Sequence, residues 1–223
     1  MVKTILITGA SGQLGLPLVQ HFSSKSYRVL GTWSGQKPGL VHPMVEWVQW
    51  TAGDLSGQQK LADRLYETGD LMAWFHLAGG FWGGSTLEMT PLQQVHHMMQ
   101  MNFFSASDLV PLVIPSLKNS PHASVLFIGA EAGLSPSPGY GAYGASKASL
   151  HYLADTLARE AGGKGITVNT LVPAIIDTAS NRTAMPDGGF DKWIKPAEIA
   201  ALIEFLISPA GSAINGSTIR LNK

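Results

Sequence analysis

A tyrosine and a lysine lie four residues apart, near the start of a segment whose pattern predicts a helix. This spacing places Tyr143 and Lys147 on one face of that helix, a turn apart. A phenol has an ordinary pKa of about 10, so it is a poor acid–base group at neutral pH unless a nearby cation favours its ionised form. We expect Lys147 to lower the pKa of Tyr143, and Tyr143 to exchange a proton with a substrate. By itself such a pair is common by chance and more often structural.

A glycine-rich loop follows the first apolar run and precedes a helical pattern. Its three regularly spaced glycines are Gly9, Gly12 and Gly15. Glycines in such a turn let the backbone approach a pyrophosphate, and the helix start offers free N–H groups to the anion. A plain Gly-rich turn is the alternative. The residues of this loop expected to bind a dinucleotide are Gly9, Ser11, Gly12, Gln13, Leu14 and Gly15.

The second apolar run ends without the carboxylate that an NAD enzyme places on the ribose hydroxyls. Ser34 and Lys37 stand there instead, and they can meet a 2′-phosphate, so the sequence favours NADP(H) over NAD(H). Lys37 is equally well explained as a solvated loop residue. Asp54 and Leu55 follow the third run, where a carboxylate can accept from the adenine amino group or cap a helix.

Seven short runs rich in Val, Ile and Leu are expected to be strands, with helix-length stretches between most of them. Continuously apolar strands are typical of a parallel sheet covered on both faces, so we predict a Rossmann-like, doubly wound α/β fold. We expect one domain over residues 1–223. The predicted strands are Lys3–Thr8, Arg28–Thr32, Val45–Trp50, Ala73–Leu77, Ser124–Gly129, Ile166–Leu171 and Thr218–Leu221.

The intervening helices have recognisable starts and interruptions. Pro91 and Pro196 fit a first helical turn, whereas Pro111 and Pro115 should kink or shorten the third helix. Loops rich in Gly and Ser are expected at 79–85, 134–144 and 178–190. The predicted helices are Gln13–Ser24, Gly57–Glu67, Pro91–Leu117, Tyr143–Ala161 and Pro196–Ile207.

Composition excludes several classes of function. The 223 residues carry 15 basic and 15 acidic side chains and no Cys. Nucleic acid is an unfavourable partner, because binding its backbone requires excess Lys and Arg. Thiol catalysis and Cys-ligated metals are excluded, and His96-His97 on a helix do not face the same way, so we expect no metal. No uninterrupted apolar run has the length of a membrane span, and we expect a soluble, cytoplasmic protein.

Taken together, these motifs resemble the short-chain dehydrogenase/reductase family over nearly the whole chain. The resemblance implies an NAD(P)H-dependent oxidoreductase in which Tyr143 is the proton donor and Lys147 also binds the nicotinamide ribose. It further implies that Asn102 holds a water on a proton relay and that Thr178 contacts the nicotinamide carboxamide. A helix-interior amide and a turn residue are the plain alternatives. The remaining residues matched at the cofactor are Ala78, Gly79, Gly80, Pro173 and Ile176.

One position departs from the family pattern. The family usually has a Ser thirteen residues before the Tyr, where this chain has Ala130. Members that reduce quinonoid dihydropterins are similar in this respect, and in 79–84, 138–139 and 177–186, so such a substrate is a candidate. Phe81 and Trp82 are then expected to contact a flat ring, or else to fill the core.

Two other functions remain open. One is a general carbonyl or quinone reductase in which Ser135, Ser137 or Tyr140 replaces the lost hydroxyl. The other is a dinucleotide-binding sensor without chemistry. The resemblance also implies a homodimer or homotetramer that associates through the two long helices, with a small molecule as substrate.

Overall fold

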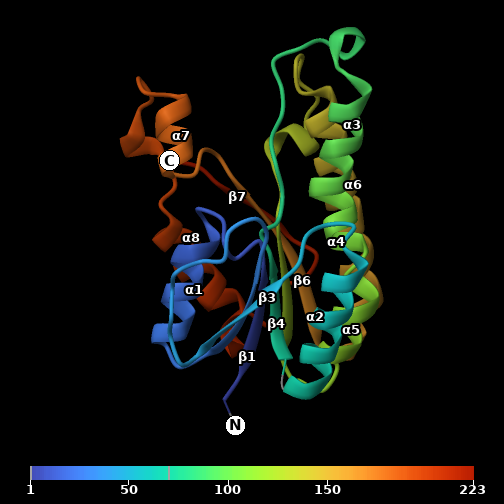
Figure 1. Ribbon diagram of the computed structural model, residues 1–223, viewed down its shortest axis with the longest axis vertical. Helices are drawn as coiled ribbons and strands as arrows, with labels where there is room; N and C mark the ends of the chain where they lie inside the picture. Colours follow the sequence, from blue (N-terminus) through green and yellow to red (C-terminus); the bar gives the residue numbers. More distant parts are fainter. Residues whose placement is uncertain (1, 70) are drawn as a thin grey trace.

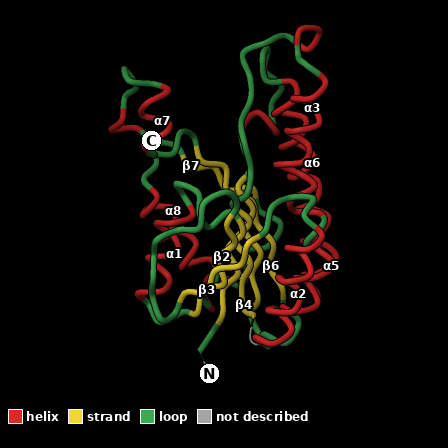
Figure 2. The backbone as a smooth tube through the Cα atoms, in the orientation of Figure 1, coloured by secondary structure: helices red, strands yellow, loops and turns green. Residues whose placement is uncertain are grey.

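The core of the protein is one sheet of seven parallel strands, seen in a computed structural model that describes residues 2–69 and 71–223 (Figures 1 and 2). The strand order is β3-β2-β1-β4-β5-β6-β7, with the order reversing between β1 and β4. All seven predicted strands are confirmed, with ends shifted by one or two residues. They are β1 (Thr4–Thr8), β2 (Arg28–Trp33), β3 (Val45–Gln49), β4 (Leu71–His76), β5 (Ala123–Ile128), β6 (Ile166–Pro173) and β7 (Thr218–Leu221).

Helices cover both faces of the sheet, which confirms the doubly wound fold. On one face, α1 (Gly15–Ser24) packs beside α8 (Pro196–Leu206). The other face carries α2 (Leu55–Thr68), α3 (Leu92–Met99), α5 (Val110–Leu117) and α6 (Gly141–Ala161). The 3₁₀ turns are η1 (Leu87–Met89), η3 (Glu131–Gly133), η4 (Gly162–Lys164), η5 (Phe190–Lys192) and η6 (Pro209–Gly211).

The single long helix predicted over Pro91–Leu117 is wrong, because the structure divides this stretch into four pieces. A π-helical turn, η2 (Gln100–Phe104), follows α3, and the short α4 (Ser105–Ser107) precedes a break and then α5. The break fits Pro111, which lies in the first turn of α5, where its missing N–H is harmless. Pro115 does not end α5, and Pro91 precedes α3 instead of opening it.

Several other predicted boundaries move in ways that affect the site. Helix α1 begins at Gly15, so Gln13 and Leu14 belong to the turn before it. Helix α6 begins two residues before Tyr143, which places that residue inside the first turn. The stretch 178–190, expected to be a loop, contains the short helix α7 (Ala179–Ala184).

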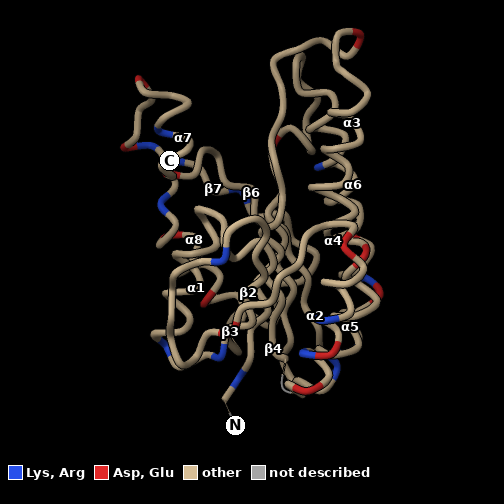
Figure 3. Tube along the Cα trace, in the orientation of Figure 1, with Lys and Arg blue, Asp and Glu red and all other residues tan. Residues whose placement is uncertain are grey.

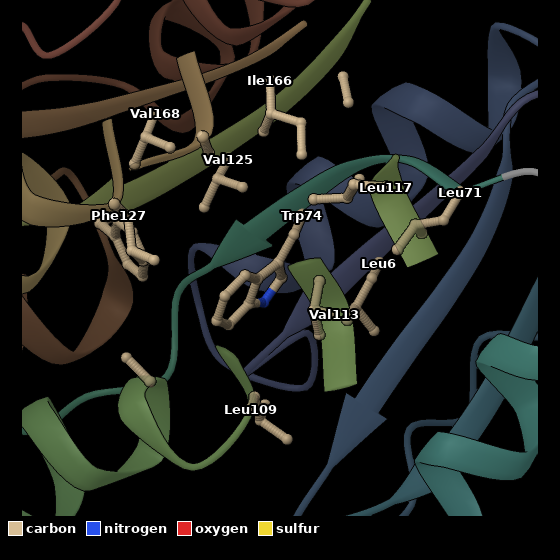
Figure 4. Packing of buried hydrophobic residues seen from close by; sticks show 14 of the residues in the cluster. Leu6, Leu71, Trp74, Leu109, Val113, Leu117, Val125, Phe127, Ile166 and Val168 are labelled. Carbon is tan, nitrogen blue, oxygen red and sulfur yellow. The ribbon is translucent and has the colours of Figure 1, made fainter. Parts of the chain in front are cut away.

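Each face of the sheet buries its own apolar cluster. Under α2, α5 and α6 lie the rings of Trp74 and Phe127, with Leu109 and Val113 packed around them (Figure 4). Under α1 and α8, Phe22 and Phe75 pack against aliphatic side chains of β1 and α8. Two covered faces explain why most strand positions are apolar instead of alternating with polar ones.

Charged side chains are sparse along the sheet and along the arm formed by the start of α3 and α6 (Figure 3). Within residues 2–69 and 71–223, no helix combines the length and the apolar character needed to cross a membrane.

Candidate active site

Chemistry-bearing residues gather at the carboxyl edge of the sheet, beside the point where the strand order reverses. The loops after β1, β4, β5 and β6 all open at this edge, between the arm of α3 and α6 and the segment that carries α7 (Figure 1). In open α/β sheets, ligands bind in the crevice at such a switch point.

The glycine loop after β1 is built for close backbone approach. Gly9 has a φ of +77°, and a Cβ there would lie 2.5 Å from the Ala78 backbone nitrogen. A Cβ at Gly15 would lie 2.4 Å from the Gly9 carbonyl oxygen. No side chain caps the start of α1, which leaves N–H groups for an anion. The loop therefore fits the pyrophosphate of a dinucleotide.

The residues expected at the adenosine half lie beside this loop. Ser34 and Lys37 are exposed after β2, and Ser34 lines a small cavity together with Gly9 and Trp50. Asp54 caps α2, where its Oδ1 accepts from the Gly57 N–H at 3.0 Å. The capping alternative for Asp54 is thus what the structure shows, while Leu55 is exposed at the start of α2.

Tyr143 and Lys147 lie on α6 and face the crevice, but the expected effect of one on the other is absent. The Lys147 Nζ donates to the Ile128 carbonyl at 2.8 Å, and burial lowers the pKa of this buried lysine to about 8. Burial raises the pKa of Tyr143 to about 12. The expectation that Lys147 lowers the Tyr143 pKa is therefore wrong for this structure, in which desolvation is what shifts the phenol.

Aromatic side chains pack beside Tyr143. The Phe81 ring meets it edge to face, with ring centroids 5.0 Å apart, and lies 5.8 Å from the ring of Tyr140. Phe81 is 62% exposed, so its position is not explained by core packing. Trp82 is half-buried in the same loop. This arrangement offers a flat apolar surface beside a phenol.

Asn102 lies fully buried in the π turn η2, and its side-chain amide is fully engaged. Its Oδ1 accepts from the Gly80 N–H and its Nδ2 donates to the Gly80 carbonyl and to the Ser146 Oγ, each at 3.0 Å. A Cβ at Gly79 would lie 2.7 Å from the Asn102 Oδ1 and 3.4 Å from the Lys147 Nζ. The Asn102 side chain thus fixes the loop after β4, which is the plain alternative of an amide bonded to backbone.

Ala130 follows β5 and is buried next to a histidine that the sequence analysis did not single out. The His151 Nε2 lies 3.4 Å from the Ala130 nitrogen and 3.3 Å from its carbonyl oxygen. Burial lowers the pKa of His151. Its position four residues after Lys147, in line with Tyr143, is the signal that would have found it.

The segment after β6 closes the other side of the crevice. Pro173 ends β6, Ile176 forms a bridge with Ile194, and the Thr178 Oγ1 caps α7 by accepting from the Asn181 N–H at 3.3 Å. The Thr178 side chain therefore has a structural role as a helix cap, close to the plain alternative of a turn residue. The adjacent Ser180 N–H donates to the Gln13 Oε1 at 2.8 Å, which ties α7 to the glycine loop.

Ser135 and Ser137 do not join this group. Both line a cavity of about 510 Å³, together with Leu87, Ala132 and Ala148. Tyr143 does not line this cavity. Of the three hydroxyls proposed to replace the missing one, only that of Tyr140 belongs to a residue beside Phe81.

The structure thus brings Tyr143, Lys147 and Phe81 to one crevice with the glycine loop on its floor. The arrangement suits hydride transfer, with a phenol as the proton source. The chain belongs to the short-chain dehydrogenase family, whose model, described as short chain dehydrogenase, matches residues 3–188. It is an oxidoreductase of that family, which acts on small molecules with a nicotinamide dinucleotide.

Among its relatives, the chain is similar to the dihydropteridine reductase of Dictyostelium discoideum. The two are 30% identical over 227 aligned positions, which cover 99% of this chain and 94% of that protein. It is also 32% identical to a 3-oxoacyl-[acyl-carrier-protein] reductase of rhamnolipid biosynthesis from Pseudomonas aeruginosa, over 75% of this chain and 71% of that protein.

Solved structures share the fold. One, described as a short chain dehydrogenase/reductase family protein, superposes with a TM-score of 0.87 at 26% identity, over 98% of this chain and 95% of that one. ElxO with NADP bound superposes with a TM-score of 0.88 at 21% identity, over 99% and 97%.

Proposed function

We propose that this protein reduces a flat, conjugated heterocycle, with quinonoid dihydropterin as the first candidate, and that Tyr143 donates the proton. The observation that carries the proposal is Ala130, a buried apolar residue where the family usually has a hydroxyl, together with the exposed Phe81 ring that packs against Tyr143. The full-length similarity to a dihydropteridine reductase supports it.

The protonation states suit reduction. With a pKa of about 12, Tyr143 keeps its proton at neutral pH and can donate it. With a pKa of about 8, Lys147 is largely cationic at pH 7, which suits the contact with the nicotinamide ribose proposed for it. The nicotinamide supplies the hydride when it is bound. Two electrons and one proton then come from the cofactor, and the second proton comes from the Tyr143 hydroxyl.

The substrate class follows from what the site lacks. Reduction of a ketone builds negative charge on one oxygen, and removing one donor from such a site typically costs about 3 kcal/mol of transition-state stabilisation. A quinonoid ring spreads the incoming charge over its own atoms, so one donor suffices. Ala130 removes the second donor while Tyr143 retains the first.

The Phe81 ring gives such a substrate a surface to lie against. An aromatic contact of this kind contributes about 0.5–1.5 kcal/mol beyond the area it buries. Because the ring is 62% exposed and next to the phenol, a flat ligand covers apolar surface and reaches the Tyr143 hydroxyl at once. Trp82 is assigned to the same surface.

The rest of the cofactor site is proposed as the sequence predicts. The glycine loop from Gly9 to Gly15 binds the pyrophosphate, and Ala78, Gly79 and Gly80 line the adjoining edge. Ser34 and Lys37 are free to meet a 2′-phosphate, because both are exposed and no carboxylate lies between Thr32 and Lys37. We therefore propose a preference for NADPH.

Carbonyl reduction is the second candidate, favoured by the 32% identity to a 3-oxoacyl reductase. It requires a hydroxyl that replaces the missing one. All three candidates line one cavity, and among them Tyr140 is favoured because its ring also lies 5.8 Å from that of Phe81.

The deciding experiment follows absorbance of the reduced nicotinamide with quinonoid dihydropterin, quinones and aliphatic ketones, each with NADPH and NADH. We expect rapid pterin turnover and slow ketone turnover in the wild type. Ala130→Ser should change pterin turnover less than about twofold and raise ketone turnover at least tenfold. Ala132→Ser, in the cavity lined by Ser135 and Ser137, is the matched control. Good ketone turnover without pterin turnover in the wild type would refute the proposal.

A further inference from the structure

A histidine that plays no part in the proposed chemistry is buried at the carboxyl end of β4. His76 is 1% exposed and packs edge to face against the rings of Trp74 and Phe127, at centroid distances of 5.5 and 5.8 Å. Its Nδ1 lies 2.8 Å from the Thr8 Oγ1 and its Nε2 lies 3.1 Å from the Ser105 Oγ. Both nitrogens therefore have partners on different elements.

The neighbouring groups fix the direction of these hydrogen bonds. The Ser105 hydroxyl donates to the Met101 carbonyl at 2.7 Å, so its oxygen must accept from His76. The Trp74 indole N–H, which can only donate, reaches the Thr8 Oγ1 at 3.1 Å. The Thr8 hydroxyl has two acceptors within reach, the His76 Nδ1 at 2.8 Å and the Phe75 carbonyl at 3.5 Å, and the shorter contact favours donation to Nδ1. With Ser105 as the acceptor on the other side, this arrangement gives a neutral His76 with its proton on Nε2.

The chain of hydrogen bonds ends in the π turn that carries Asn102. The backbone N–H of Ser105 donates to the carbonyl of Gln100, five residues back, instead of to that of Met101. The Met101 carbonyl is thereby left for the Ser105 hydroxyl. Turns of this kind cluster at functional sites, and here the serine that supports the turn is oriented by His76.

We propose that His76 is a positioning residue for the active site: through Ser105 it holds the π turn that sets Asn102 against Gly80 and Ser146. The same histidine bonds Thr8, the residue before Gly9, so it ties the start of the dinucleotide loop to the loop after β4. Asn102 in turn bonds both backbone groups of Gly80, next to Lys147. Only the kinetic test of His76 depends on the proposed function.

His76 acts through geometry and not through titration. Burial, reinforced by the charge of Lys147, lowers the pKa of His76 to about 3, so its ring is neutral throughout the physiological range. Thr8, Trp74, Phe127 and Ser105 complete its surroundings, and none of them carries a charge.

The first test measures the wild-type protein, needs no substrate, and uses one variant only to assign the signal. Nitrogen-15 shifts of the histidine rings in the wild-type protein report tautomer and charge, and His76→Gln assigns the signal. We expect a neutral Nε2–H ring from about pH 5 to 8. A neutral ring with its proton on Nδ1, or a cation at pH 6, would overturn the proposal.

The second test measures the turn itself. Hydrogen exchange of the Gly80 amide, which donates to Asn102, should become at least tenfold faster in Ser105→Ala and return toward the wild-type rate in Ser105→Thr, which restores the hydroxyl. Ser107→Ala is the matched control, since Ser107 lies on the same short helix, is half-buried, and its hydroxyl donates to the Phe104 carbonyl instead of to the Met101 carbonyl. An unchanged exchange rate of the Gly80 amide in Ser105→Ala would refute the role of the hydrogen bonds that run from His76 through Ser105.

The third test separates positioning from general stability. We expect Ser105→Ala to lower kcat about tenfold with little change in the KM for cofactor, and the double variant with Asn102→Ala to be no slower than Asn102→Ala alone. Additive losses would contradict the proposal. If the wild type does not reduce pterins, the proposed function fails, and the exchange and tautomer measurements still decide the role of His76.

Discussion

Replacing Lys147 by methionine should change how folding stability depends on pH. Burial moves the pKa of this lysine from its ordinary 10.5 to about 8, a difference that corresponds to about 3 kcal/mol at 1.4 kcal/mol per unit. The unfolded chain binds the proton first as pH falls, so stability declines between about pH 10.5 and 8 and then levels off. From pH 9.5 to pH 7 the wild type should lose about 2 kcal/mol through this group.

Urea unfolding of the cofactor-free protein, followed by the fluorescence of its 6 Trp residues, measures this loss. The difference in unfolding free energy between wild type and Lys147→Met isolates the group, because other titrations cancel. The lost hydrogen bond to the Ile128 carbonyl adds a constant at every pH. Lys164→Met, at an exposed lysine, is the control and should show a flat difference. A flat difference for Lys147→Met as well would refute the burial argument.

Three further outcomes are expected at the site and on the surface. Tyr143→Phe should cut turnover by about 10²–10⁴ and leave cofactor binding nearly intact, and wild-type turnover with chemistry rate-limiting would contradict the assignment. Ser34→Asp should shift preference from NADPH toward NADH in fluorescence titrations, because a carboxylate repels the 2′-phosphate; tighter NADH binding by the wild type would overturn the NADPH preference. Light scattering should find a dimer or tetramer. Phe104→Lys or Tyr152→Lys should dissociate it, because both replace exposed aromatic residues near the long helices. A monomeric wild type would refute the predicted oligomer.

The sheet could be predicted from sequence because strands covered on both faces are apolar at most positions. Tyr143 and Lys147 could be paired because a helix turn fixes their relation. The π turn at Gln100–Phe104 could not be predicted, since it inserts one residue into a helical pattern without disturbing the apolar positions around it. The bond from His76 to Ser105 spans 29 residues and depends on that insertion. The direction of the Tyr143 pKa shift could not be predicted, because how deeply a side chain is buried depends on the tertiary fold.

The bond between Gln13 and Ser180 bears on the order of events during turnover. It joins two segments 167 residues apart in sequence, one at the dinucleotide loop and the other on the helix that borders the crevice. Any movement of α7 away from the glycine loop must break this bond, so a release of nucleotide that requires such a movement carries its cost. An interaction that steadies α7, such as the ion pair between Arg182 and Asp177, adds to the same cost. Side chains that never touch a reacting atom thereby help to set the energy of that movement.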